Sequence, residues 1–425
     1  MFYLIHETLS IYKYLQIVMK EDTESAKILG EEFDNALSEE LSESENSEQK
    51  LTENENNEEE EEEEENLNKE AETESSGKDV NKEEIDDDID LDVGSLPGVG
   101  PISKKRLVDS GIYTVMDIAV RGASEIADVT SWDLSKAEDL SRKAREKLVE
   151  LGKLEDEFVT ASELHTRRIK IDKISTGTES LDDLLGGGIE TQGITEFYGE
   201  FGTGKTQICN TLCVMSQLPK EVGGLKTSDR KIGVIFVDTE GTFRPDRIIE
   251  IAKTRGFENP ESFNDNIFVA KAYNSAHQEI IVQRATQEIR NKKAEGIDIR
   301  LMIVDSIVAH FRAEFLGRGT LSARQQRLNK FVHLLLRVAE THDIAVVGTN
   351  QVHASPDSYF GDPIRPTGGH VLGHTSTYRI YVKKAGKNRI ARMVDSPSHP
   401  DREVLYTLNE KGIDDPESAT KTKKK

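Results

Sequence analysis

The spacing of apolar residues changes along this chain. Residues 20–92 hold few apolar side chains between acidic runs, whereas residues 95–152 place apolar residues at the three- and four-residue intervals of helices. Beyond residue 174, continuous apolar runs alternate with helical stretches, which is typical of an α/β fold with a mainly parallel sheet. The positions that predict a small helical bundle in the middle region are Ile118, Ile126, Val129, Leu134, Leu140 and Leu148.

Four stretches, three of them continuous apolar runs and the first interrupted by Thr195 and Glu196, predict buried strands of the sheet. A helix is expected after the first run, over residues 207–218, where Ile208, Leu212 and Met215 have helical spacing. In open α/β sheets ligands bind beyond the carboxyl ends of the strands, so the polar residues after each run are the candidates for chemistry. The runs cover residues 194–198, 232–237, 301–304 and 344–349.

The first 19 residues are apolar but interrupted. His6, Glu7 and Lys13 break the run and no small-residue cleavage site follows it, so we expect neither a membrane span nor a signal peptide. Three interpretations remain open: an amphipathic helix that binds a partner, an unstructured stretch, or a true start at Met19.

An acidic segment follows, with an unbroken glutamate run over residues 58–65. Like-charge repulsion and scarce apolar residues leave little to offset the entropy of ordering it, so disorder is predicted. This extension, residues 1–94, could bind basic partners, screen a basic surface or keep the chain in solution.

The formal net charge of −24 comes from that extension. Residues 1–95 hold 33 of the 79 acidic residues and only 7 of the 55 basic ones, so the remainder is close to neutral and a nucleic-acid partner is not excluded. The two cysteines, Cys209 and Cys213, exclude a disulfide framework or a four-cysteine zinc site and fit a reducing compartment. We expect both to be buried on the helix over residues 207–218.

One motif predicts a phosphate site. It fits G-x-x-x-x-G-K-[ST], in which backbone N–H groups surround phosphates, the lysine reaches the terminal phosphates and the threonine ligates Mg²⁺. A predicted strand precedes it and a predicted helix follows, so an anion would lie at a helix N-terminus. The motif residues are Gly199, Glu200, Phe201, Gly202, Thr203, Gly204, Lys205 and Thr206.

Polar residues follow the other three strands. Glu240, after the run at 232–237, is the candidate base for the water that attacks a γ-phosphate. Asp305, after the run at 301–304, is the candidate for holding Mg²⁺ through water. Either acid alone could instead cap the next helix. An amide after the run at 344–349, from Asn350 or Gln351, could bind the γ-phosphate and sense its loss.

A glycine-containing turn opens the helical region. Residues 96–100 read Leu-Pro-Gly-Val-Gly and precede three cations at 104–106. The pattern resembles a helix-hairpin-helix, in which Gly98, Gly100 and Lys104 would meet a DNA phosphate without reading sequence. A purely structural hairpin or a protein-docking module remains the alternative.

Three stretches are expected to lack regular structure. Residues 154–174 predict a linker, in which Phe158 and Ala161 could fill pockets on another subunit. Residues 312–327 and 352–373 predict two long basic loops, which suit a single strand of nucleic acid or form a nucleotide lid. The first loop contains Arg324 and the second contains Tyr359, Phe360 and Arg365, but no individual base contact is assigned to Tyr359 or Phe360.

Together the motifs from residue 96 to 414 resemble an archaeal RadA-type recombinase of the RecA superfamily. The resemblance rests on residues 96–100, 158–161 and 199–206 and on Asp-Thr-Glu-Gly-Thr-Phe-Arg-Pro at 238–245, with Gly-Arg-Gly at 317–319, Leu-Ser-Ala-Arg-Gln at 321–325 and Thr-Asn-Gln-Val at 349–352. It implies a RecA-like P-loop ATPase core that uses ATP and Mg²⁺. The long acidic N-terminus departs from the family pattern, and no family role transfers to it.

The resemblance also implies roles for single residues. Phe158 and Ala161 would dock into a neighbouring core and build a helical filament or a ring of this chain. Arg247 would pack on adenine, His374 and Gln351 would sense the γ-phosphate between protomers, and residues 395–400 would cap the neighbour's nucleotide. Arg318 and Arg324 would contact DNA in the first loop.

The expected function is therefore DNA-dependent ATP hydrolysis with strand exchange between single- and double-stranded DNA, in the cytoplasm at the nucleoid, with mediator proteins as possible partners and no membrane. An accessory paralogue that binds ATP and DNA without exchange is the alternative, and a hexameric helicase is a more distant one. The expected domains are an extension (1–94), a helix-hairpin-helix domain (95–152), a linker with the polymerisation motif (153–173), the ATPase core (174–414) and a basic tail (415–425).

Overall fold

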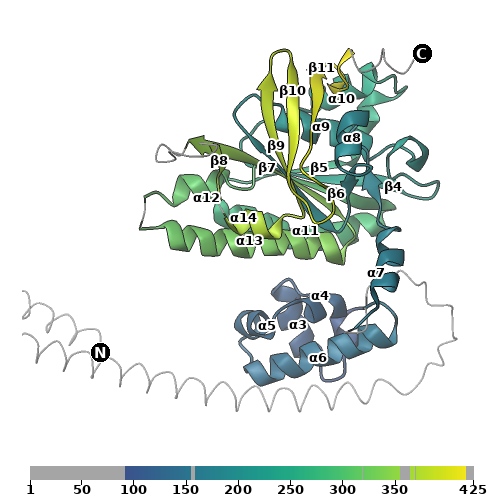
Figure 1. Ribbon diagram of the computed structural model, residues 1–425. Helices are drawn as coiled ribbons and strands as arrows, with labels where there is room; N and C mark the ends of the chain where they lie inside the picture. Colours follow the sequence, from purple (N-terminus) through teal and green to yellow (C-terminus); the bar gives the residue numbers. More distant parts are fainter. Residues whose placement is uncertain (1–90, 155–157, 318, 355–363, 369, 418–425) are drawn as a thin grey trace, which may run out of the picture. The chain divides into compact units, whose positions relative to one another are not determined.

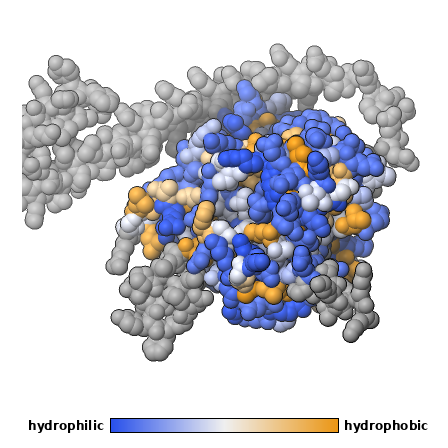
Figure 2. All heavy atoms as spheres, turned by 90° about the horizontal axis from the view of Figure 1, so that it is seen from above, coloured by the Kyte–Doolittle hydropathy of each residue, from blue (hydrophilic) through white to orange (hydrophobic). Residues whose placement is uncertain are grey.

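The computed structural model describes residues 91–154, 158–317, 319–354, 364–368 and 370–417. The predictions for residues 1–90 of the acidic extension, Arg318, Tyr359, Phe360 and the end of the basic tail lie outside these residues, as does the side chain of Arg365. Among the described helices, none has the length and apolar character needed to cross a membrane. Figure 2 shows one face of the molecule, on which hydrophilic residues predominate and hydrophobic residues form small separate groups.

The N-terminal described part is helical, as the apolar spacing predicts. Ile118, Ile126 and Leu148 are buried together with Leu107 and Ile112, but Val129 and Leu134 are 44% and 49% exposed, so their prediction as core residues is wrong. Val93, before the expected boundary at residue 95, belongs to the same buried cluster. The elements are η1 (Val93–Ser95), α3 (Pro101–Asp109), α4 (Val115–Val120), α5 (Ala123–Thr130) and α6 (Leu134–Glu150).

Local signals explain the start of two of these helices. Gly98 adopts a φ of 94°, which favours glycine, and Gly100 and Pro101 are the N-cap and first residue of α3. Thr114 and Asp117 form a capping box at α4, each side chain bonding the backbone of the other. The turn before α3 is thus set by its glycines and proline.

The expected linker contains a helix, α7 (Ala161–Arg168), which the sequence reasoning did not predict. Its capping box is Thr160 and Glu163, the [ST]-x-x-[DE] signal that could have revealed it. After α7, the strands β1 (Lys173–Ile174) and β2 (Ile189–Glu190) form a small antiparallel sheet, with α8 (Glu179–Leu184) between them.

The central sheet has the order β12-β11-β10-β9-β3-β7-β6-β4-β5, and β8 pairs with β7. Its six strands from β9 to β5 are parallel, while β10, β11 and β12 add on antiparallel. The prediction of an α/β fold with a mainly parallel sheet is confirmed. The strands are β3 (Gly193–Gly199), β4 (Lys231–Asp238), β5 (Ile267–Lys271), β6 (Ile297–Asp305), β7 (Ala345–Ala354), β8 (Ile364–Pro366), β9 (Tyr378–Ala385), β10 (Asn388–Asp395), β11 (Glu403–Asn409) and β12 (Gly412–Asp414).

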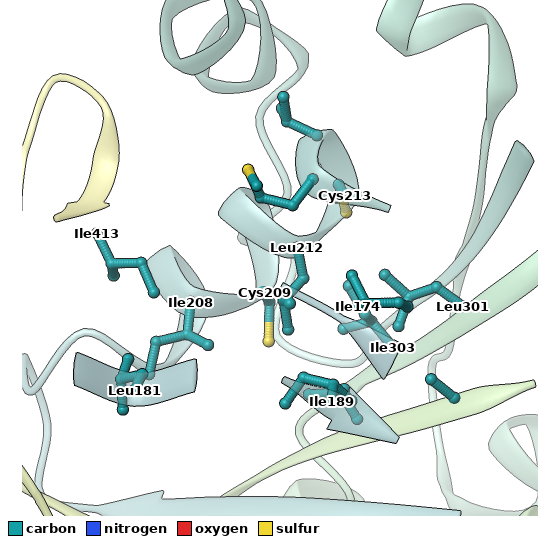
Figure 3. Close-up of a cluster of buried hydrophobic side chains, with 14 of the residues drawn as sticks. Ile174, Leu181, Ile189, Ile208, Cys209, Leu212, Cys213, Leu301, Ile303 and Ile413 are labelled. Atoms are coloured by element: carbon teal, nitrogen blue, oxygen red, sulfur yellow. The ribbon is translucent and has the colours of Figure 1, made fainter. Parts of the chain in front are cut away.

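Helices cover both faces of this sheet (Figure 1). Residues of α9 and α10 pack on one face and residues of α11, α13 and α14 on the other, each with its own buried cluster. Figure 3 shows α9 in the first cluster, where Cys209 and Leu212 lie near Ile303 of β6. The helices are α9 (Lys205–Met215), α10 (Pro245–Thr254), α11 (Ser275–Ala294), α12 (Ala309–Glu314), α13 (Leu321–Thr341) and α14 (His370–Thr375), with η2 (Lys220–Val222) and η3 (Pro260–Asn266) between strands.

Both cysteines are fully buried on α9, as expected. Burial raises the pKa of both thiols, so they stay protonated and pack as small apolar groups.

Both expected long loops contain regular structure. Arg312 lies in α12 and Arg324 in α13, so only residues 315–320 connect the two helices. The second stretch contains β8, paired antiparallel with β7, and most of α14. The elements α12, β8 and α14 were not predicted because each is short and is stabilised by pairing or packing rather than by its own pattern, whereas α13 is a long helix whose first turns lie inside the expected loop.

Candidate active site

The carboxyl ends of β3, β4, β6 and β7 meet at one cleft of about 430 Å³. It brings together most of the residues that the sequence singles out for nucleotide chemistry. Thr203 is buried beneath the loop rather than lining the cleft. The predicted residues that line it are Gly199, Glu200, Phe201, Gly202, Gly204, Lys205, Thr206, Glu240, Asp305 and Gln351.

The loop between β3 and α9 needs its glycines. Gly202 and Gly204 have φ values of 72° and 102°, a region that side chains rarely adopt. A Cβ on Gly199 would lie 2.1 Å from the carbonyl oxygen of Val382 in β9. The hydroxyl of Tyr406 in β11 also supports the loop, because it donates a hydrogen bond to the Thr203 carbonyl at 3.2 Å. The loop is therefore preshaped, with the N-terminus of α9 directed at the cleft.

Lys205 is the first residue of α9 and folds back over the loop. Its Nζ donates to the carbonyls of Gly199 and Glu200, both at 2.9 Å. Burial lowers the pKa of Lys205, while the carboxylates of Asp305 and Glu240 oppose that shift. A partly desolvated ammonium whose hydrogen bonds go to two neutral carbonyls is well suited to bind phosphate oxygens.

Thr206 and Asp305 form the candidate metal site. The Thr206 hydroxyl donates to Asp305 Oδ2 at 2.7 Å, and the Thr349 hydroxyl donates to Oδ1. Burial raises the pKa of Asp305, and these two hydrogen bonds oppose the shift. One hydroxyl and one carboxylate fit Mg²⁺, which keeps several waters and takes further oxygens from phosphates. Among the described residues, no group of three or more acidic, histidine or cysteine side chains offers a closed metal cage.

Asp238 has a role that the sequence reasoning missed. Its buried carboxylate accepts backbone N–H groups from Glu240, Gly241 and Thr242 through Oδ1, at 3.2, 2.7 and 3.1 Å, and from Phe243 through Oδ2 at 3.1 Å. The four bonds wind the chain after β4 into a tight turn that directs Glu240 into the cleft. An acid that ends an apolar strand and precedes a glycine by three residues was the available signal.

Glu240 and Gln351 meet across the cleft. Gln351 Nε2 donates to Glu240 Oε1 at 3.0 Å, from β7 to the turn after β4. The candidate base and the candidate sensor, 111 residues apart in the chain, are therefore in direct contact.

Other predicted site residues lie away from the cleft. Arg247 of α10 donates to Gln207 Oε1 at 2.9 Å and to the Asn409 carbonyl at 2.6 Å. Gln207 lines the cleft, so Arg247 is one hydrogen bond away from it. His374 is exposed at the end of α14 and does not line the cleft. Arg324 lies in the first turn of α13.

The remaining candidates lie outside the sheet domain or in its linker. Lys104 pairs with Asp92 at 2.8 Å, so its charge is partly neutralised within the chain. Phe158 is 92% exposed and Ala161 is also exposed.

Residues 167–416 of this chain match the family model described as Rad51. The chain belongs to the Rad51 family. It is also 50% identical, over 332 residues, to the DNA repair and recombination protein RadA of Cenarchaeum symbiosum (strain A), which covers 78% of this chain and 81% of that relative. The resemblance to archaeal RadA-type recombinases is thus confirmed. The Rad51 match includes the central sheet and every residue that lines the cleft.

Proposed function

We propose that this protein is an ATP-dependent recombinase that assembles on single-stranded DNA, pairs it with homologous duplex and exchanges strands in DNA repair. The observation that carries the proposal is the cleft of a Rad51-family chain in which Lys205, the Thr206–Asp305 pair and the Glu240–Gln351 pair converge. The similarity to a relative named as a DNA repair and recombination protein supports the same assignment over the accessory-paralogue alternative. Work on chromosomal DNA would place it at the nucleoid.

Each group of residues in the cleft suits one part of ATP hydrolysis. The loop from Gly199 to Thr206 surrounds the phosphates with backbone N–H groups, and Lys205 exchanges its loop carbonyls for phosphate oxygens. Thr206 and, through water, Asp305 would hold Mg²⁺, which neutralises charge on the β- and γ-phosphates. Glu240 orients the attacking water and accepts its proton. Gln351, already bonded to Glu240, would move toward the γ-phosphate and change its contact when that group leaves.

Self-assembly is supported by exposed apolar side chains in the linker and at the rim of the cleft. Phe158 is 92% exposed, next to the exposed Ala161, and Phe201 at the rim of the cleft is 95% exposed. Large exposed aromatic residues at these positions suit docking to another copy of the chain. Phe158 and Ala161 would enter a neighbouring core, and His374 with residues 395–400 would reach the neighbour's nucleotide.

DNA contacts are proposed at two places. Gly98, Gly100 and Lys104 lie at the start of α3, where backbone N–H groups favour a phosphate. Arg324 at the start of α13, with Arg318 in the preceding connection, would bind the DNA backbone.

The test replaces Lys205 by Ala and assays joint-molecule formation between a single strand and a homologous duplex with ATP. We expect exchange to be lost, because the loop then lacks its only cationic side chain toward the phosphates among the described lining residues. Lys220→Ala, on the exposed η2, is the control and should keep wild-type exchange. Unimpaired exchange by Lys205→Ala would contradict the proposed mechanism.

A further inference from the structure

A buried polar cluster lies on the sheet next to the cleft and takes no part in the steps above. At its centre is Glu196 of β3, which is completely buried. Arg379 Nε of β9 lies 2.7 Å from Glu196 Oε2, and Asn350 Nδ2 of β7 donates to Glu196 Oε1 at 2.7 Å. Glu196, Arg379 and Asn350 are called the Glu196 cluster below. It joins three neighbouring strands, since β3 lies between β7 and β9.

The Glu196 cluster fixes the side chain next to the sensor. Successive residues of a strand point to opposite faces, so holding Asn350 on one face of β7 holds Gln351 on the other. On that other face Gln351 Nε2 lies 3.0 Å from Glu240 Oε1. The cluster therefore sets the position from which Gln351 reaches the candidate base.

The same cluster reaches the segment that follows β8. Asn350 Nδ2 also donates to the Thr367 carbonyl at 2.7 Å, and the Thr367 N–H donates to the Gln351 carbonyl at 2.9 Å. A Cβ on Gly373 of α14 would lie 3.1 Å from Arg379 Nη1, so α14 packs directly on the guanidinium. Thr367 thus contacts the cluster at Asn350, and Gly373 contacts it at Arg379. A structural change between residues 367 and 375 would therefore reach the cluster at both residues.

Three polar atoms of this region are buried without a hydrogen-bond partner among the described residues: Arg379 Nη2, Asn350 Oδ1 and Thr367 Oγ1. Unsatisfied buried polar atoms are uncommon in folded proteins. A buried ion pair also gives little net stability over apolar residues of the same volume. These three atoms are available for hydrogen bonds in a second arrangement of the cluster.

We propose that Glu196, Asn350 and Arg379 are positioning residues that hold Gln351 against Glu240 and couple this contact to residues 367–375. The sequence predicts a loop suited to a nucleic-acid strand that includes residues 367–373, and through the cluster DNA bound there changes the rate of ATP hydrolysis. The inference rests on the proposed function, because it assigns the cluster a role within DNA-stimulated hydrolysis.

The test variant combines Glu196→Gln with Arg379→Met, which removes both charges and nearly keeps the volume. ATP hydrolysis by the full chain is measured with and without a mixed-sequence single-stranded oligonucleotide. We expect kcat with DNA to fall about tenfold while the KM for ATP changes less than about twofold, since coupling residues alter communication rather than binding. Asn350→Leu leaves the ion pair intact and should show the same loss if the double variant does not fold.

Glu190→Gln is the matched control. Glu190 is likewise a buried strand carboxylate, bonded to Arg168 at 2.5 Å and to the Tyr378 hydroxyl, but it makes no bond to Asn350 or Thr367. The Glu190→Gln variant should have lower thermal stability than the wild type, but DNA should stimulate its ATP hydrolysis as much as in the wild type. Wild-type stimulation in both the double variant and Asn350→Leu would overturn the proposal.

Hydrogen exchange separates this inference from the proposed function. Peptides covering residues 364–376 and 199–206 are followed with and without Mg²⁺ and a non-hydrolysable ATP analogue. In the wild type both should exchange more slowly with the analogue; in the double variant only residues 199–206 should respond. A wild type without DNA-stimulated hydrolysis would refute the proposed function, while an unchanged response of residues 364–376 in the variants would refute the coupling.

Discussion

At the scale of single residues, Asp238 decides where the candidate base lies. Its carboxylate accepts hydrogen bonds from four backbone N–H groups. Asp238→Asn replaces one carboxylate oxygen by an amide NH2 group, which would face a backbone N–H group and could not bond to it. We expect the free energy of unfolding to fall by about 1–3 kcal/mol and kcat for ATP hydrolysis to fall by up to about 100-fold through displacement of Glu240. Denaturant unfolding and steady-state kinetics check both. Asp229→Asn, at an exposed position, is the control, and equal kcat values in the two variants would refute the role.

Tyr378 gives a pH dependence of stability. Burial, together with its hydrogen bond to Glu190, raises the pKa of Tyr378 from 10.0 to about 12. Between pH 10 and 12 the unfolded chain has lost this proton and the folded chain keeps it, so the free energy of unfolding falls as pH rises, by at most about 1.4 kcal/mol per pH unit.

The measurement is denaturant unfolding of the wild type and Tyr378→Phe across that range. The variant should be less stable at pH 8, because Glu190 loses a donor, but its stability should decline less above pH 10. Parallel curves for the two proteins would show that Tyr378 does not titrate as described.

At the scale of elements, the approach of β3 to β9 leaves no room for a side chain at the start of the phosphate loop. Gly199→Ala would place a Cβ 2.1 Å from the Val382 carbonyl, so the strands must separate. We expect a loss of about 1–3 kcal/mol of stability and weaker binding of a fluorescent ATP analogue. Gly319→Ala, where a Cβ meets nothing within 4 Å, should leave both unchanged. Wild-type nucleotide affinity in Gly199→Ala would show that the loop tolerates the separation.

The sequence predicts those elements whose own pattern suffices. The strands β4, β6 and β7 are apolar runs and β3 directly precedes the phosphate loop, and the polar residues that end these strands could be assigned to one edge of a parallel sheet. The helix α7 and the strand β8 escaped prediction because they are short and polar and depend on a capping box or on pairing with β7. The Glu196 cluster was also missed, since its three residues meet only when β3, β7 and β9 are neighbours.

At the scale of the whole molecule, the proposed filament depends on an aromatic side chain that the described residues leave exposed. Phe158 is 92% exposed, and an aromatic anchor that fills a neighbour's pocket carries a large share of an interface's energy. Phe158→Ala should weaken self-association by roughly 30-fold or more, the factor that about 2 kcal/mol produces. The proposed ATP site is shared between neighbours, so DNA-stimulated hydrolysis should decrease when the variant fails to assemble. It should recover at higher protein concentration, where assembly is restored.

Light scattering and hydrolysis with ATP and single-stranded DNA, each over a range of protein concentrations, test this dependence. Val222→Ala, at a position that is 56% exposed in η2, removes apolar surface of a similar kind and should behave as wild type. Recovery at high concentration would assign the defect to assembly rather than to the cleft, because the residues of the cleft are intact in Phe158→Ala. If Phe158→Ala assembles at wild-type concentrations, the contact between neighbours must be made by other exposed residues, and the exposed Phe201 at the rim of the cleft is the next to replace.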